Sequence, residues 1–83
     1  MSYQIKFSEK GEKQFNKLEK SIAKRFLNVF ERIRQRPFHF LKKKEGTPYF
    51  LLRVGNYRAV LDIDLKEKII YVIEAGHRKD IYK

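Results

Sequence analysis

A Gly-Asn pair between two apolar runs is the feature that most restricts how this chain folds. Gly55 and Asn56 separate the alternating runs 49–54 and 57–64, and such a pair is typical of a two-residue hairpin turn because both residues tolerate positive φ. A turn of this length also sets the register of the two strands. The register predicts an apolar face suited to pack on helices, made of the pairs Val54–Tyr57, Leu52–Ala59 and Phe50–Leu61.

The same register places two arginines together on the other face. Arg53 lies directly across from Arg58, and like charges in such positions are mildly destabilising unless an anion or a carboxylate compensates them. One interpretation is an anion-binding site, and the other is a surface ion network that contributes little to stability. The remaining pairs on this face are Leu51–Val60 and Tyr49–Asp62.

A further strand is predicted over residues 69–75, where apolar and β-branched residues follow a turn. If its hairpin pairs Asp64 with Lys68, then Glu74 faces Arg58 and is the carboxylate that compensates it. This register predicts that the core positions of the strand are Ile69, Tyr71 and Ile73.

The N-terminal half predicts one strand followed by two helices. Residues 2–7 alternate strictly between apolar and polar, which is the period of a half-buried strand. Ser8 is a candidate N-cap for a helix over 9–20, and Pro37 ends a second helix over 21–35. The apolar face of that second helix consists of Ile22, Phe26, Val29, Phe30 and Ile33. All these elements predict a single α+β domain over residues 1–83.

Residues 32–44 carry six basic side chains and no acidic one. One interpretation is a solvated helix end whose loop is anchored by Phe38 and Phe40. The other is a surface that tracks phosphates, in which Lys42, Lys43 and Lys44 take part. The net charge of +10 favours an anionic polymer as the partner, because it accelerates encounter with phosphates.

The composition excludes several kinds of site. Without cysteine, the chain has neither disulfides nor a thiolate zinc site. Two histidines and scattered acidic residues predict no metal centre, and no cofactor is expected. The N-terminus lacks a signal-peptide pattern, and the longest apolar run, residues 69–73, is too short to cross a bilayer. We therefore expect a cytoplasmic protein with no membrane partner.

The order of elements, the segment 52–58 and the ending 76–82 resemble toxins of the RelE/ParE superfamily, especially RelE-type mRNA interferases of archaeal and bacterial toxin–antitoxin systems. The resemblance covers nearly the whole chain. It implies a fold like that of microbial ribonucleases, with two N-terminal helices packed on a twisted, mainly antiparallel four-stranded sheet in the order β-α-α-β-β-β. It also implies a type II toxin that inhibits translation by cleaving messenger RNA on the ribosome.

The resemblance also assigns roles to residues. By position, Arg58 and Arg78 are similar to the family arginines that bind the scissile phosphate. Tyr82 is similar to a C-terminal tyrosine of the family that takes part in proton transfer or base stacking. RNA supplies its own nucleophile, the 2′-hydroxyl, so cations and an acid–base pair suffice without a metal. We expect Arg53 to assist the other arginines and Glu74 to be an alternative base. The predicted RNA-binding residues are Lys42, Lys43, Lys44, His77 and Lys79.

The partners implied are the ribosome, its messenger and a RelB-like antitoxin in a heterotetrameric complex. An antitoxin helix is the predicted cover for Leu51 and Val60, which would otherwise be exposed. Two alternatives stay open. Tyr49 and Leu51 stand where RelE members carry basic residues, which favours a ParE-like toxin that inhibits DNA gyrase. The same departure fits a catalytically weakened module that keeps only antitoxin binding.

Overall fold

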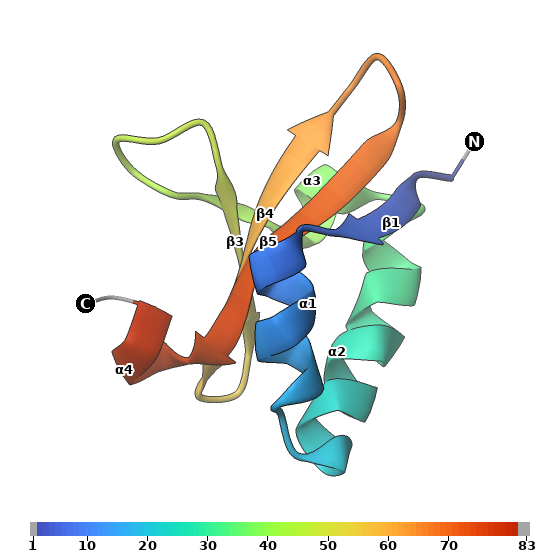
Figure 1. Ribbon diagram of the computed structural model, residues 1–83. Helices are drawn as coiled ribbons and strands as arrows, with labels where there is room; N and C mark the ends of the chain where they lie inside the picture. The colour runs from blue at the N-terminus through green and yellow to red at the C-terminus, as the bar shows by residue number, and fades with distance from the viewer. Residues whose placement is uncertain (1, 82–83) are drawn as a thin grey trace.

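The computed structural model describes residues 2–81 and contains a five-stranded sheet in the order β1-β5-β4-β3-β2. β1 runs parallel to β5, and the other neighbours are antiparallel. Helices α1 and α2 pack on one face of the sheet (Figure 1). The elements are β1 (Gln4–Phe7), α1 (Glu9–Asn16), α2 (Lys20–Ile33), α3 (Pro37–Phe40), β2 (Lys42–Lys43), β3 (Phe50–Val54), β4 (Tyr57–Asp64), β5 (Ile69–His77) and α4 (Arg78–Ile81). The α+β class is as predicted.

Helix α1 begins where the sequence predicts. The side chain of Ser8 accepts a hydrogen bond from the Gly11 backbone N–H at 2.9 Å, which confirms the N-cap. The Ser8 hydroxyl also lies 3.2 Å from the Val72 carbonyl oxygen, so it links the helix to β5. A Cβ at Gly11 would overlap that same oxygen. Glycine at this position therefore lets α1 approach β5 more closely than any other residue would.

Helix α2 supplies the centre of the core. Phe26, Phe30 and Ile33 are buried on its predicted apolar face, and Ile22 and Val29 pack at the margin. Phe15 of α1 stacks on Phe30 with ring centroids 6.1 Å apart. The sheet residues that complete this core are Leu52, Val54, Ala59, Leu61, Ile70, Val72 and Ala75.

The chain after α2 differs from the prediction in two ways. Pro37 does not simply end α2, because it begins the short helix α3, where a missing N–H costs nothing. Lys42 and Lys43 form β2, a two-residue edge strand, so the sheet has five strands among the described residues rather than the predicted four. None of the helices between residues 2 and 81 has the length and hydropathy needed to cross a bilayer.

The β3–β4 hairpin has the predicted register. Val54 pairs with Tyr57, and Gly55 has φ of 60°. This positive φ is the conformation for which glycine is preferred. Each of the other predicted pairs from Phe50–Leu61 to Arg53–Arg58 is also present.

The β4–β5 hairpin begins one residue away from the predicted register. Asp64 pairs with Ile69 rather than with Lys68. Its Oδ1 accepts hydrogen bonds from the backbone N–H groups of Lys66 and Glu67 at 3.0 and 2.9 Å. Lys68 takes φ of 59° and closes the loop. The side chain of Asp64 thus organises a four-residue loop in which Lys68 belongs to the turn.

A β-bulge then changes the second half of β5. Leu61 pairs with Val72 whereas Val60 pairs with Glu74, so Ile73 is an extra residue in the ladder. A shift of one residue exchanges the two faces of a strand. The one-residue offset at the loop places Ile70 and Val72 in the core, and the bulge makes Ala75 rather than Glu74 the next core position, so the predicted set Ile69, Tyr71 and Ile73 is wrong.

Candidate functional site

Two arginines lie side by side on the sheet face that α1 and α2 leave uncovered. Arg53 of β3 pairs across the strands with Arg58 of β4, and their neighbours Leu52 and Ala59 point into the helical core. Because side chains alternate along a strand, both arginines point to the opposite side. We call this side the arginine face, defined by Leu51, Arg53, Arg58 and Val60.

The two arginines differ in their surroundings. Arg53 is exposed, whereas Arg58 is only 9% exposed. Nη1 of Arg58 donates hydrogen bonds to the carbonyl oxygens of Gly55 and Tyr57 at 3.1 and 3.0 Å. The guanidinium carries three further N–H groups on Nε and Nη2, outside these two bonds. The turn therefore holds Arg58 in place next to its exposed partner Arg53.

The bulge decides what stands opposite Arg58. The predicted neighbour Glu74 is wrong, since Gly76 pairs with Arg58. Glu74 lies across from Val60 instead, and its Oε1 is 3.0 Å from Nζ of Lys10. The carboxylate is thus engaged with α1 and does not compensate the arginine pair.

The C-terminal helix brings a third arginine to the same turn. The backbone N–H of Arg78 donates to the carbonyl oxygen of Asn56 at 2.8 Å. Ile81 Cδ1 lies 3.8 Å from the position that a Cβ on Gly76 would occupy, so α4 folds back over the glycine. Arg78 and Lys79 thus stand beside the hairpin end that carries Arg58. Tyr82, the predicted acid or base, lies outside the described residues.

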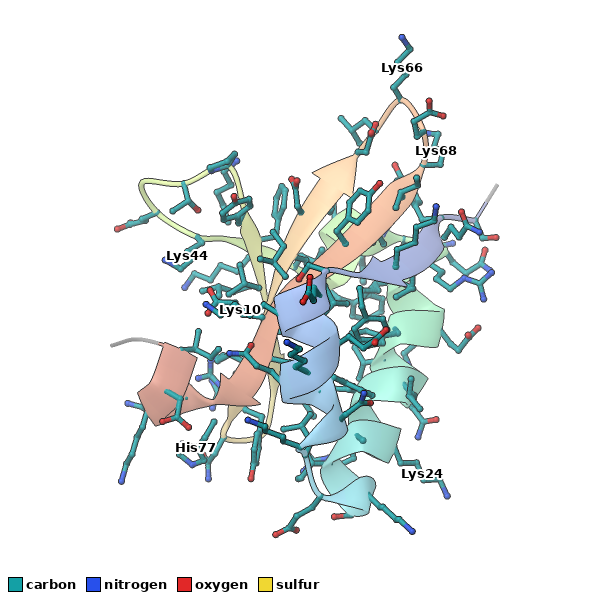
Figure 2. The ribbon with its side chains drawn as sticks, viewed as in Figure 1. Lys10, Lys24, Lys44, Lys66, Lys68 and His77 are labelled. Carbon is teal, nitrogen blue, oxygen red and sulfur yellow. The ribbon has the colours of Figure 1, made fainter. Side chains whose placement is uncertain are left out.

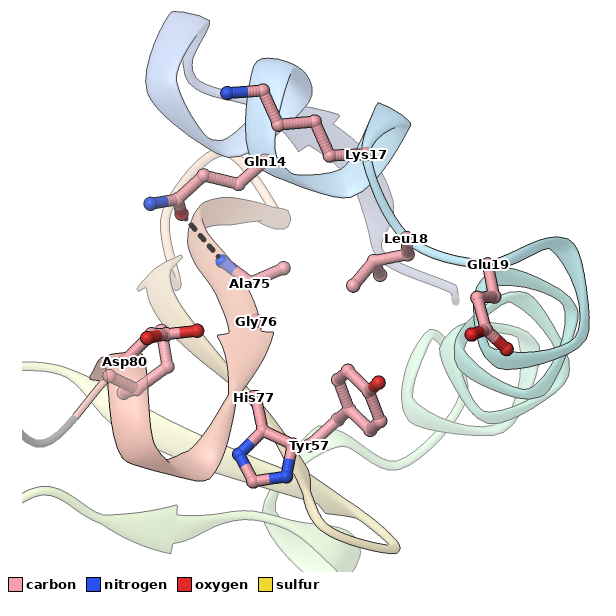
Figure 3. A pocket seen from close by; sticks show the side chains of 10 residues that line it. Gln14, Lys17, Leu18, Glu19, Tyr57, Ala75, Gly76, His77 and Asp80 are labelled. Carbon is pink, nitrogen blue, oxygen red and sulfur yellow. Dashed lines mark hydrogen bonds between the residues drawn. The ribbon is translucent and has the colours of Figure 1, made fainter.

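His77 belongs to the other side of the sheet. It pairs with Tyr57, whose ring it meets edge-on with centroids 5.3 Å apart. Its Nδ1 accepts a hydrogen bond from the Lys79 backbone N–H at 3.2 Å. His77 and Tyr57 line a hollow of about 500 Å³ that reaches Gln14 of α1, and Figure 3 shows the two side chains next to each other. His77 therefore supports the start of α4 rather than extending the arginine face.

The predicted lysine cluster is divided by the edge strand β2. Lys42 pairs with Leu51 and so shares the arginine face, whereas Lys43 pairs with Phe50. Nζ of Lys43 lies 4.9 Å from the centroid of the Phe50 ring. The backbone N–H of Lys44 donates to the Tyr49 carbonyl at 2.9 Å. Lys42 is the member of this cluster that strand pairing places with the arginines.

The predicted apolar spot on the arginine face is smaller than expected. Val60 is 1% exposed and Leu51 is half-buried. The prediction that both side chains are open to a partner is therefore wrong for Val60.

Sequence reasoning missed Arg25. Its Nη1 on α2 lies 3.3 Å from the position that a Cβ on Gly55 would occupy, so another guanidinium rests against the turn. No local pattern links these residues, because the contact exists only once α2 packs on the sheet. Figure 2 shows other cations away from this turn, with Lys66 and Lys68 together at the β4–β5 loop and Lys24 on α2.

The site offers cations and no recognisable metal ligand set. Among residues 2–81, no three His, Cys, Asp or Glu side chains are grouped so as to hold a metal ion. The arrangement of Arg53, Arg58 and Arg78 around one turn suits a phosphate, because guanidinium groups form charge-assisted and often bidentate hydrogen bonds with its oxygens.

Comparisons with known proteins match this chain to one family model and to several solved structures. The family model of the ParE toxin of the type II toxin-antitoxin system, parDE, matches residues 5–82. No match was found among curated protein sequences.

Solved structures of the same fold include three toxin–antitoxin complexes. A chain of the archaeal RelE–RelB complex from Pyrococcus horikoshii OT3 is 27% identical, with a TM-score of 0.78 over 94% of this chain and 97% of that one. A chain of the RelB–RelE complex from Methanococcus jannaschii is also 27% identical, with a TM-score of 0.76 over 93% and 94%. The RelBE2 complex from Mycobacterium tuberculosis gives 21% identity and a TM-score of 0.83 over 94% and 100%.

Proposed function

The chain belongs to the ParE toxin family of type II toxin–antitoxin systems, within the RelE/ParE superfamily, and we propose that it acts as a ribosome-dependent, metal-independent endoribonuclease. In this proposal it cleaves messenger RNA and thereby inhibits translation in the cytoplasm. The 2′-hydroxyl of the substrate attacks the adjacent phosphorus, and the 5′-oxygen leaves.

The observation that carries the proposal is the gathering of Arg53, Arg58 and Arg78 at the β3–β4 turn. Arg53 and Arg58 are cross-strand partners, and the backbone of Arg78 is bonded to the turn at Asn56. A phosphate in the transition state gains negative charge, which fixed cations stabilise. Arg58 suits this role best, because the turn carbonyls already hold its guanidinium. Its position thus needs little reorganisation during the reaction.

Proton transfer in this proposal falls to Tyr82, which directly follows α4 in the sequence. Glu74 is a weaker candidate base, since its carboxylate is paired with Lys10. A ribosome that holds the messenger in a reactive geometry supplies part of the catalysis through positioning. Free RNA is then a poor substrate.

The second candidate is a gyrase-inhibiting toxin. It is supported by the match to the ParE family model and by Tyr49 and Leu51, which stand where RelE members carry basic residues. The departure at Tyr49 and Leu51 also fits a weakened toxin that only binds its antitoxin. In each case we propose a RelB-like antitoxin as partner in a heterotetramer, because the structural relatives named above are toxin–antitoxin complexes.

The test is a cleavage assay on ribosomes that hold a defined messenger and an empty decoding site, with ends mapped by primer extension. Arg53→Ala and Arg78→Ala are compared with Lys24→Ala, which removes one exposed cation of α2 outside the basic segment 32–44. Cuts that depend on the ribosome, persist in the control and disappear in the two site variants support the proposal. If the wild-type protein makes no cuts but inhibits DNA gyrase, the second candidate replaces it.

A further inference from the structure

Two phenylalanines of α3 are unusually exposed. Phe38 is 52% exposed and Phe40 is 43% exposed, whereas Phe26 and Phe30 are buried in the core. Large apolar side chains gathered on a surface commonly mark a binding site. Neither ring belongs to the core cluster, so their exposure indicates a surface that a partner covers.

The rings belong to a small aromatic and cationic cluster. Phe38 meets Phe50 edge-on with centroids 5.5 Å apart, and Phe40 meets His39 at 5.0 Å. Nζ of Lys43 lies 4.9 Å from the centroid of Phe50. We call this cluster the edge platform, defined by Phe38, His39, Phe40, Lys43 and Phe50. It combines flat apolar surfaces with a neighbouring cation.

The charge around the edge platform selects among partners. The segment 36–44 contains Arg36 and the three lysines 42–44 but no acidic residue. A partner that covers the rings must therefore bring negative charge close to flat surfaces. Unpaired nucleotides meet both needs, because bases stack on aromatic rings while their phosphates contact lysine and arginine.

The edge platform and the arginine face lie on opposite sides of the sheet and meet at the edge strand β2, where Lys43 pairs with Phe50 and Lys42 with Leu51. Lys42 pairs with Leu51, which stands two residues from Arg53 on β3, a separation of about 7 Å along a strand. Cations thus continue from the arginines to the sheet edge. Building on the proposed function, we propose that Phe38 and Phe40 stack on unpaired RNA bases that flank the cleavage site.

The test measures binding separately from cleavage. The probe is a fluorescent single-stranded 2′-O-methyl RNA of about 12 nucleotides, which lacks the attacking hydroxyl, and a matching strand with abasic nucleotides. Phe38→Leu with Phe40→Leu keeps the apolar volume but removes the rings, and Phe38→Tyr with Phe40→Tyr keeps the rings. Lys42→Gln with Lys43→Gln is the charge control. Thermal melting verifies that each variant is folded.

The leucine variant is expected to bind the base-containing RNA on the order of tenfold more weakly for each ring lost. Its affinity for the abasic strand stays that of the wild type, and the tyrosine variant binds both strands normally. The lysine variant weakens binding to both strands and lowers the salt dependence of affinity, because each lysine contacts phosphate.

Three outcomes overturn the inference. The wild-type protein does not distinguish the two strands, or the leucine variant binds the base-containing RNA as tightly as the wild type. In the third, the leucine variant loses affinity for the antitoxin alone, and the edge platform is a protein-docking surface. The ribosome assay tests the proposed function independently. If the protein cleaves messenger RNA but loss of both rings leaves RNA binding unchanged, only the stacking inference is wrong. If the rings bind RNA bases but the protein never cleaves, only the proposed function is wrong.

Discussion

The two antiparallel hairpins of the sheet share strand β4 but are built differently. The β3–β4 hairpin turns through two residues and keeps a regular ladder up to Phe50–Leu61. The β4–β5 hairpin turns through four residues and contains a bulge at Ile73. The regular hairpin fixes Arg53 opposite Arg58. The irregular one brings Gly76 rather than Glu74 across from Arg58, so the arginine faces a residue with no side chain. The regular β3–β4 hairpin and the bulged β4–β5 hairpin together leave Arg53 and Arg58 with no carboxylate paired across the strands.

Among substitutions that act on one hairpin and not the other, Gly11→Ala is expected to have the largest effect, on the bulged β4–β5 hairpin. The new Cβ overlaps the Val72 carbonyl just before the bulge, so α1 must move away from β5. We expect the free energy of unfolding to fall by about 3 kcal/mol in chemical denaturation. Lys13→Ala, on the exposed side of the same helix, should change it by less than about 0.5 kcal/mol. A Gly11→Ala protein as stable as the wild type would contradict the close approach.

The regular hairpin is tested by comparing its two arginines. Arg58→Ala removes two hydrogen bonds from a charged group to the turn, and we expect a loss of about 2 kcal/mol in stability. Arg53→Ala should change stability by less than about 0.5 kcal/mol, because its side chain is exposed. Ribosome-dependent cleavage is expected to fall by about 100-fold in Arg53→Ala. Equal losses of stability in the two variants would show that Arg58 is not held by the turn.

Positive φ values sharpen the comparison of the two turns. Gly55 and Lys68 have φ of 60° and 59°. Gly55→Ala should lower the free energy of unfolding by about 1 kcal/mol, because a Cβ is disfavoured in this conformation. Lys68→Gly relieves the same strain and should raise it by about 0.5 kcal/mol. Thermal denaturation checks both values, and a Lys68→Gly protein that is less stable than the wild type would argue against the strain.

The smallest effect is expected from Glu74→Gln. Its ion pair with Lys10 is partly exposed, and such pairs contribute less than about 1 kcal/mol. We expect no change in cleavage rate, since the carboxylate does not face Arg58. The ribosome assay would instead assign Glu74 as the general base if the rate fell by about 100-fold.

The predictable part of the candidate site rests on local chemistry. Gly55 and Asn56 determine a two-residue turn, and that turn determines that Arg53 meets Arg58. The second hairpin lacks such a signal. Its loop depends on the side chain of Asp64, which accepts two backbone hydrogen bonds, and several loops fit the same residues. The pairing of Glu74 with Arg58 was therefore predicted from a register that the chain does not use.

The sequence by itself determined the α+β class, the cap at Ser8, the apolar face of α2 and the register of the β3–β4 hairpin. Each follows from the period of apolar residues or from the chemistry of a short segment. Tertiary structure alone decided the bulge at Ile73, the burial of Val60 and the contact of Arg25 with the turn. The contact of Arg25 depends on how α2 packs against the sheet, and the bulge and the buried Val60 depend on how strands pair across it. Segments far apart in the chain hold no local record of either arrangement.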